Sequence, residues 1–125
     1  MDKKKILVVD DDNDIVTYLT TLLEDNGYAT VAARDGVEAS DRLREARPDL
    51  ICLDITMPEK SGVRFYRELR EAPETAGIPV VIVTGIIDEF KQFIHTRKQV
   101  PPPDGYLSKP IDEKALLELV SRLVG

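Results

Sequence analysis

Apolar residues follow two alternating patterns along the chain. Short, nearly continuous apolar runs occupy residues 5–10, 28–33, 49–54 and 79–85, with a shorter run within 105–110. Runs of this kind predict strands that are covered on both faces. Between them, apolar residues recur at helical spacing over 15–26, 36–46, 63–70 and 112–124, and more weakly over 87–98. The pattern therefore predicts five strands, each followed by a helix.

Local signals mark where these helices end and which residues face the core. Gly27 and Pro48 are placed to terminate the first two helices, and Asp112 to begin the last one as its N-cap. On the second helix we expect Val37, Ala39 and Leu43 to face the core; on the last helix, Leu116, Leu117, Val120 and Leu123.

Five strand–helix units in succession indicate an α/β fold, a (βα)5 doubly wound parallel sheet with helices on both faces and right-handed crossovers. The chain has 125 residues without a break in composition, so we expect one domain over residues 1–125. Folds of this kind bind ligands beyond the carboxyl ends of their strands.

Chemically active residues lie at these predicted strand ends. The first strand ends in Asp10 and Asp11, the third in Asp54 and the fourth in Thr84, and Lys109 follows the fifth. Carboxylates that lie close together are costly unless positive charge lies among them. Lys109 supplies one charge, and oxygen-only ligands favour Mg²⁺, or Mn²⁺, for the rest.

An acidic site with a divalent cation, a lysine and a hydroxyl is suited to phosphoryl transfer. The chain has no GxxxxGK[ST] loop, so a nucleoside triphosphate is not the expected ligand. The available nucleophile is a carboxylate, which would form an acyl phosphate. The only histidine, His95, lies on the weak fourth helix and is expected at the surface.

Composition narrows the classes of partner. The net charge is −6 with a pI of about 4.8, which disfavours direct nucleic-acid binding. No apolar run reaches membrane-spanning length and no signal peptide is recognisable, so we expect a cytoplasmic protein without membrane insertion. The single cysteine, Cys52, lies within an apolar run and is expected to be buried and unreactive.

Five stretches carry a resemblance to a known family: ILVVDDDNDI, ARDGVEA, PDLICLDITMPEKSG, ETAGIPVVIVTG and GYLSKPID. Together they make the chain resemble the receiver domain of two-component response regulators along nearly its whole length. The resemblance implies a flavodoxin-like sheet with strand order 2-1-3-4-5. It also implies a phosphorelay protein that is not an enzyme beyond self-phosphotransfer and autodephosphorylation.

The resemblance assigns the phosphoacceptor and the metal ligands. Asp54 would accept a phosphoryl group from a phosphohistidine of a sensor histidine kinase or a phosphotransfer protein. Asp54 and Asp11 would bind Mg²⁺ directly, together with the backbone carbonyl of Thr56. Asp10 would act mainly through metal-bound water.

The resemblance also assigns the residues that respond to phosphorylation. Lys109 would pair with a phosphoryl oxygen, and the Lys109–Pro110 bond would be cis. Thr84 would move to hydrogen-bond the phosphate, and Tyr106 would rotate inward behind it. The result would be altered binding of a downstream protein target by a monomer or a weak phosphorylation-dependent dimer.

Two features depart from the family pattern. Ile86 occupies a position that is often polar, and we hypothesise that it slows hydrolysis of the acyl phosphate. The segment HTRKQVPPPDG is longer than usual and contains Pro101, Pro102 and Pro103. It is either a tolerated surface insertion or an edge that is specific for one partner, and it makes the family's dimer mode doubtful here.

Two other classes of protein remain as alternatives. A small Mg²⁺-dependent phosphohydrolase could use Asp54 as nucleophile, but such enzymes commonly have a second aspartate where Thr56 stands. A degenerate receiver could act as a phosphorylation-independent interaction module, but the complete acidic set with Thr84 and Lys109 argues against it. The third acid of the first cluster, Asp12, is expected to cap the first helix instead of binding metal.

Overall fold

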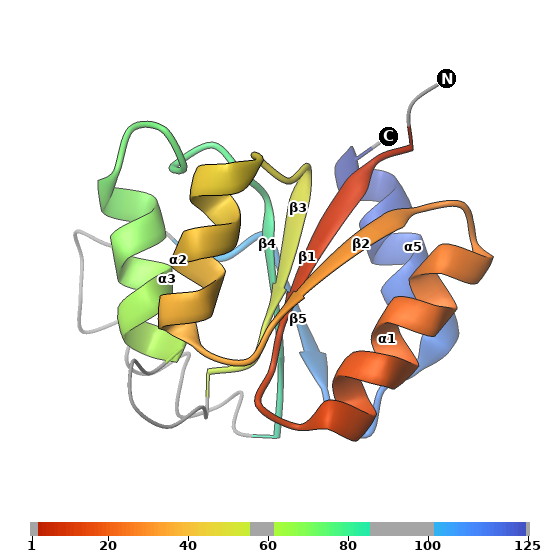
Figure 1. Ribbon diagram of the computed structural model, residues 1–125. Helices are drawn as coiled ribbons and strands as arrows, with labels where there is room; N and C mark the ends of the chain where they lie inside the picture. The colour runs from red at the N-terminus through yellow and green to blue at the C-terminus, as the bar shows by residue number, and fades with distance from the viewer. Residues whose placement is uncertain (1–2, 56–61, 86–101, 125) are drawn as a thin grey trace.

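The computed structural model describes residues 3–55, 62–85 and 102–124 (Figure 1). Its described strands form one parallel sheet in the order β2-β1-β3-β4-β5, which confirms the expected topology. The strands are β1 (Lys5–Val9), β2 (Ala29–Ala33), β3 (Leu50–Leu53), β4 (Val80–Thr84) and β5 (Gly105–Ser108). The described helices are α1 (Asn13–Asp25), α2 (Gly36–Glu45), α3 (Gly62–Glu71) and α5 (Glu113–Val124).

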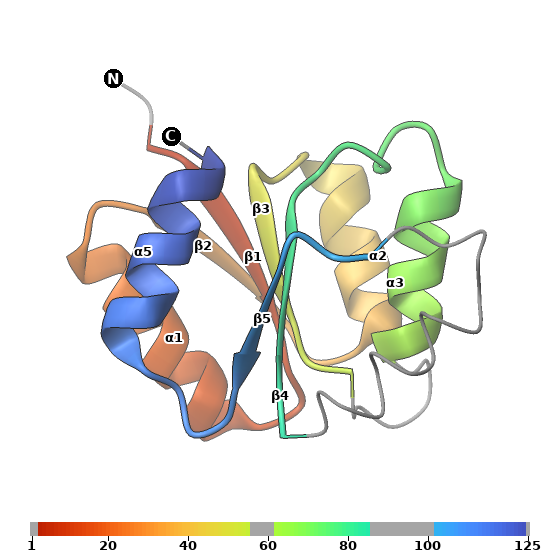
Figure 2. The ribbon, with the colours of Figure 1, turned by 180° about the vertical axis from the view of Figure 1, so that it is seen from behind.

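Helices cover both faces of the sheet. Figures 1 and 2 show α1 and α5 on one face and α2 and α3 on the other. Alternate residues of each strand point to opposite faces, so Leu7 and Val9 join the core beneath α2 and α3, whereas Ile6 and Val8 join the core beneath α1 and α5. This two-sided burial explains why the strands are continuously apolar in sequence.

Side-chain and glycine caps mark the beginnings and ends of helices where the sequence predicts them. Asp12 begins α1, its Oδ1 accepting hydrogen bonds from the backbone N–H groups of Asp14 at 2.9 Å and Ile15 at 3.4 Å. Gly27 follows α1 with a φ of 93°, a left-handed conformation that costs glycine little. Asp112 accepts a bond from the N–H of Ala115 at 3.2 Å at the start of α5.

Val37 corrects the expectation for the second helix. Its side chain is 55% exposed, whereas Gly36 and Ala39 are buried and Leu43 is half-buried against the core. The helix begins at Gly36, and residues one position apart lie about 100° apart around a helix. The buried stripe therefore runs through Gly36, Ala39 and Leu43 and leaves Val37 toward solvent.

The last helix also differs in detail from its expected stripe. Leu116 and Val120 are buried as expected, but the third buried residue is Leu119, and Leu117 is only partly buried. Leu119 packs directly over Gly105 of β5, where a Cβ atom would lie 2.6 Å from its methyl group. The missing side chain of this glycine lets α5 approach the edge strand closely.

Several predictions concern residues outside the described ranges. These are the fourth helix at 87–98, His95, Thr56, Ile86 and Pro101. At the described end of the proline-rich segment, Pro102 is exposed and Pro103 is buried. Within the described ranges, no helix has the length and apolar character needed to cross a membrane.

Candidate functional site

The backbone of the sheet brings the predicted site residues together. Asp54 follows β3, and its N–H donates to the carbonyl of Val9 at 2.9 Å, next to Asp10. Lys109 follows β5, and its N–H donates to the carbonyl of Thr84 at 3.1 Å. Parallel pairing thus places residues from four strands at one edge of the sheet, as the sequence predicts.

Three carboxylates form a compact cluster at this edge. Oxygen atoms of Asp10, Asp11 and Asp54 all lie within 4.8 Å of one another. Asp10 and Asp54 are each only 2% exposed, whereas Asp11 is exposed. The ammonium of Lys109 lies 2.9 Å from Oδ2 of Asp10 and 3.5 Å from Oδ2 of Asp54. Lys109 therefore bridges the two buried acids from the opposite end of the chain.

Burial and charge shift the proton affinities of this cluster. The pKa of Asp10 is raised, chiefly by burial and also by the charge of Asp54. The hydrogen bond from the Asp12 N–H and the hydrogen bond and charge of Lys109 lower it, but by less in total. Burial alone would lower the pKa of Lys109. The hydrogen bond to Asp10 and the charges of Asp54 and Asp10 outweigh that effect, so the pKa of Lys109 is raised.

The donor set fits a hard divalent cation. Among the residues that the structure describes, three carboxylates face one ammonium group, which leaves an excess of negative charge in a largely buried place. Oxygen-only ligands of this kind suit Mg²⁺ or Mn²⁺, whereas zinc sites usually include nitrogen or sulfur. Of the four residues expected to bind metal, the structure places Asp10, Asp11 and Asp54 together, and Thr56 lies outside the described residues.

Thr84 and Tyr106 lie on the two neighbouring strands that border the cluster. Thr84, the last residue of β4, is fully buried. Tyr106 is half-buried and packs against the core beneath α2 and α3, and burial raises the pKa of its hydroxyl. The peptide bond between Lys109 and Pro110 is cis, which confirms the expectation drawn from the resemblance.

Two further groups, which the sequence does not reveal, help to position the carboxylates of the site. The backbone N–H of Asp12 donates to Oδ1 of Asp10 at 3.0 Å, which orients that carboxylate. Gly62 is the first residue of α3. A Cβ atom there would lie 2.3 Å from both the carbonyl oxygen of Asp54 and the Cα of Ile55. The glycine thus lets α3 begin directly against the backbone of Asp54.

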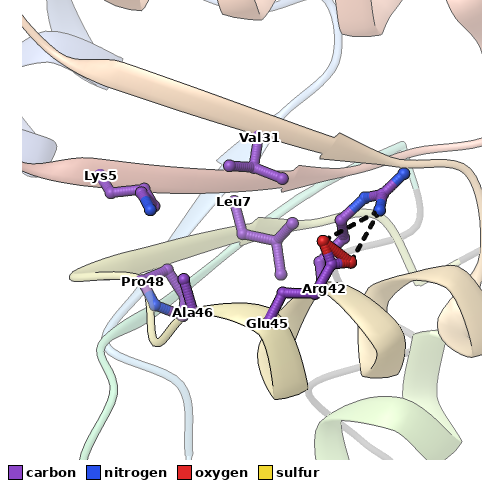
Figure 3. Close-up of a pocket in the computed structure, with 7 residues that line it drawn as sticks. All are labelled: Lys5, Leu7, Val31, Arg42, Glu45, Ala46 and Pro48. Carbon is purple, nitrogen blue, oxygen red and sulfur yellow. Dashed lines mark hydrogen bonds and ion pairs between the residues drawn. The ribbon is translucent and has the colours of Figure 1, made fainter.

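One pocket among the described residues lies away from these carboxylates. It has a volume of about 130 Å³ and lies between the C-terminal end of α2 and the start of β1, where the ion pair of Arg42 and Glu45 flanks it (Figure 3). Its lining residues are Lys5, Leu7, Val31, Arg42, Glu45, Ala46 and Pro48. Because this is the opposite edge of the sheet, the pocket is not part of the acidic site.

Sequence comparison places the chain in a known family. The family model described as the response regulator receiver domain matches residues 6–121. The chain belongs to this family, and its role is that of a phosphoacceptor domain in two-component signalling.

Individual relatives agree with this assignment. The chain is 37% identical to the protein Rrf1 of Nitratidesulfovibrio vulgaris over 118 residues, which cover 94% of this chain and 80% of that protein. It is 34% identical to the polar-differentiation response regulator DivK of Brucella anthropi, covering 98% and 97% of the two chains. Chemotaxis protein CheY4 of Vibrio cholerae has a similar structure, with a TM-score of 0.86, 32% identity, and coverage of 98% and 99%.

Proposed function

We propose that Asp54 is the residue that accepts the phosphoryl group. The observation that supports this assignment is the convergence of Asp10, Asp11 and Lys109 on its buried carboxylate. A carboxylate oxygen of Asp54 attacks the phosphorus of a phosphohistidine. The phosphorus–nitrogen bond breaks, and its electron pair stays on the imidazole. The product is an acyl phosphate on Asp54.

Lys109 and the acidic residues adjust the charge around the reacting group. Lys109 is already held by Asp10 and Asp54, so a phosphoryl oxygen on Asp54 would arrive within reach of its ammonium. Asp10, Asp11 and Asp54, with the Thr56 carbonyl, are the groups that would hold Mg²⁺, or Mn²⁺ in its place. When bound, the cation neutralises negative charge on the phosphoryl oxygens.

Thr84 and Tyr106 are the residues through which phosphorylation would change the surface of the protein. We propose that the buried Thr84 hydroxyl hydrogen-bonds the new phosphoryl group and that Tyr106 rotates inward behind it. A hydroxyl can act in this way because only the phosphorylated state offers it that partner. The changed surface then binds or releases a downstream protein.

The partners follow from the class of protein. We propose a sensor histidine kinase or a phosphotransfer protein as phosphodonor, and a protein as the downstream target, in the cytoplasm. The acidic net charge of −6 gives no support to direct nucleic-acid binding. We propose a monomer that dimerises at most weakly on phosphorylation and has no catalytic activity beyond its own phosphorylation and dephosphorylation.

Intact-mass measurement after incubation with Mg²⁺ and a small acyl-phosphate donor tests the proposal. The wild type is expected to gain one phosphoryl group, and Asp54→Ala to gain none. Asp41→Ala is the matched control because Asp41 lies on the surface of α2, paired with Arg44. Repeated turnover of the donor without a stable adduct would instead favour a phosphohydrolase. Absence of any adduct would favour a phosphorylation-independent interaction module.

A further inference from the structure

An arginine with a largely covered side chain links three segments at the edge of the sheet opposite the acidic cluster. Arg70, near the end of α3, has a side chain that is only 7% exposed. Its Nη1 donates to the carbonyls of Ala76 at 3.0 Å and Ile78 at 2.8 Å. Its Nη2 donates to Oδ2 of Asp104 at 2.9 Å, and its Nε to the hydroxyl of Tyr66 at 3.2 Å. We name these contacts the Arg70 clamp.

Asp104 extends the clamp into two strands. The N–H of Val80 donates to Oδ2 of Asp104 at 2.8 Å, and the N–H of Asp104 donates to the carbonyl of Val80 at 2.9 Å. These reciprocal bonds fix the entry to β5 against the start of β4. Pro103, immediately before Asp104, is buried. The same carboxylate oxygen accepts from both Arg70 and Val80.

The clamp lies beside the tyrosine that is proposed to respond to phosphorylation. Asp104 immediately precedes β5, and Tyr106 is the second residue of that strand. Asp104 bonds Arg70 of α3, and Tyr106 packs against the core beneath α2 and α3, so both side chains lie on the α3 side of the sheet. Tyr66 and Arg70 are four positions apart on one helix and share a face of α3. Arg70 stacks on the Tyr66 ring, 5.1 Å from its centroid, and Tyr106 packs against the core cluster that contains Tyr66. Burial raises the pKa of Tyr66, the bond to Arg70 lowers it, and proximity to Tyr106 contributes to raising it.

We propose that Arg70 is a positioning residue for Tyr106. It fixes the backbone of β5 through Asp104 and fixes the adjacent core through the Tyr66 ring. It thereby sets the orientation of Tyr106 in the unphosphorylated protein and the size of its response to phosphorylation. The response to phosphorylation rests on the function proposed above, whereas the resting orientation does not.

The geometry of these contacts requires an arginine, and another cationic side chain could not make all of them. Its planar guanidinium reaches two carbonyls, a carboxylate and a hydroxyl at once from three different nitrogen atoms. A lysine ammonium could keep the ion pair with Asp104 but could not span all four partners. Arg70→Lys therefore separates the role of the clamp from the role of the charge.

Fluorine NMR on protein labelled with 3-fluorotyrosine tests this proposal. The chain has four tyrosines, and each signal can be assigned with a tyrosine-to-phenylalanine variant. The variants are Arg70→Lys and the milder Asp104→Asn, which keeps an acceptor for the Val80 N–H. Arg67→Lys is the matched control because Arg67 lies on the same helix, is 40% exposed, and pairs with Glu71 at 3.6 Å. Spectra are recorded before and after incubation with Mg²⁺ and the acyl-phosphate donor, with occupancy measured by intact mass.

We expect Arg70→Lys to reach wild-type phosphorylation occupancy, because Arg70 is not part of the acidic cluster. Its Tyr106 signal should be displaced or broadened before phosphorylation, and the change on phosphorylation should fall to less than half of the wild-type change. Asp104→Asn should move the Tyr106 signal in the same direction by a smaller amount. Arg67→Lys should match the wild type in both states.

A lower melting temperature with an unaltered Tyr106 signal in both states would overturn the proposal and leave Arg70 a purely structural residue. If Arg70→Lys does not fold, the Tyr106 signal of Asp104→Asn in both states is compared with the wild type instead, and an unaltered signal overturns the proposal. A wild-type protein that takes up no phosphoryl group would refute the proposed function instead. In that event the resting Tyr106 signal of the variants still tests the clamp.

Discussion

Lys109 Nζ lies 2.9 Å from Oδ2 of Asp10, although 99 positions separate the two residues in the chain. The next acceptor of the same ammonium is Asp54, at 3.5 Å. The ammonium therefore lies closer to Asp10 than to Asp54. In the function proposed above, Lys109 would move from this position toward a phosphoryl oxygen on Asp54.

Asp10→Asn should stabilise the protein at neutral pH when divalent cations are removed with EDTA. The pKa of Asp10 is raised in the folded state, chiefly by burial, so the ionised carboxylate lowers stability above that pKa. This cost disappears as the pH falls through the folded pKa and Asp10 becomes protonated. The stabilisation should therefore shrink toward acid pH, as measured by denaturant unfolding. An Asp10→Asn protein less stable than wild type at pH 7 in EDTA would contradict this account.

Asp11 and Asp12 are neighbours with different expected roles. Asp11 is exposed and belongs to the carboxylate cluster, so Asp11→Ala should abolish the rise in melting temperature that Mg²⁺ produces. Asp12 caps α1, so Asp12→Ala should lower the free energy of unfolding by about 1 kcal/mol and retain the response to Mg²⁺. Thermal unfolding across a Mg²⁺ titration measures both effects. Equal losses of Mg²⁺ response in the two variants would refute the division.

Gly62→Ala should disturb the proposed phosphoacceptor through its backbone. The added Cβ would lie 2.3 Å from the carbonyl oxygen of Asp54, so the start of α3 or the end of β3 must shift. We expect a loss of about 1–3 kcal/mol in the free energy of unfolding, as is common when a packed site is overfilled. Phosphorylation by the acyl-phosphate donor should also slow.

Gly85→Ala is the control for this substitution, because no heavy atom of the described residues outside the local chain lies within 4 Å of a Cβ placed there. It should change stability by no more than about 0.5 kcal/mol. If Gly62→Ala were equally mild in stability and phosphorylation rate, the close approach of α3 to Asp54 would have no functional importance.

Cys52 should be inert in the folded protein. It is 1% exposed on β3, and burial raises the pKa of its thiol to about 12, so almost no thiolate exists at pH 8. A disulfide-exchange reagent should therefore label it only as fast as the protein unfolds, and labelling should become rapid in denaturant. Fast stoichiometric labelling under native conditions would contradict the buried position.

Much of the site could be predicted from the sequence because it depends on local pattern and simple topology. Asp54 and Lys109 were identifiable because each stands at the carboxyl end of a predicted strand, and parallel strands bring such ends to one edge. Asp12 was identifiable as a cap because its side chain bonds N–H groups only two and three positions ahead. The role of Thr56 stays a prediction, since it lies outside the described residues.

The sequence by itself determined the alternation of strands and helices and the acids at the strand ends, because backbone preference and hydrophobic period act over a few residues. Tertiary structure alone decided that Val37 faces solvent, that α3 begins against the backbone of Asp54, and that Arg70 reaches Asp104, 34 positions away. Each of these depends on how two separately predictable elements pack. Burial and side-chain pairing across such an interface are properties of both elements together, and neither local sequence contains them.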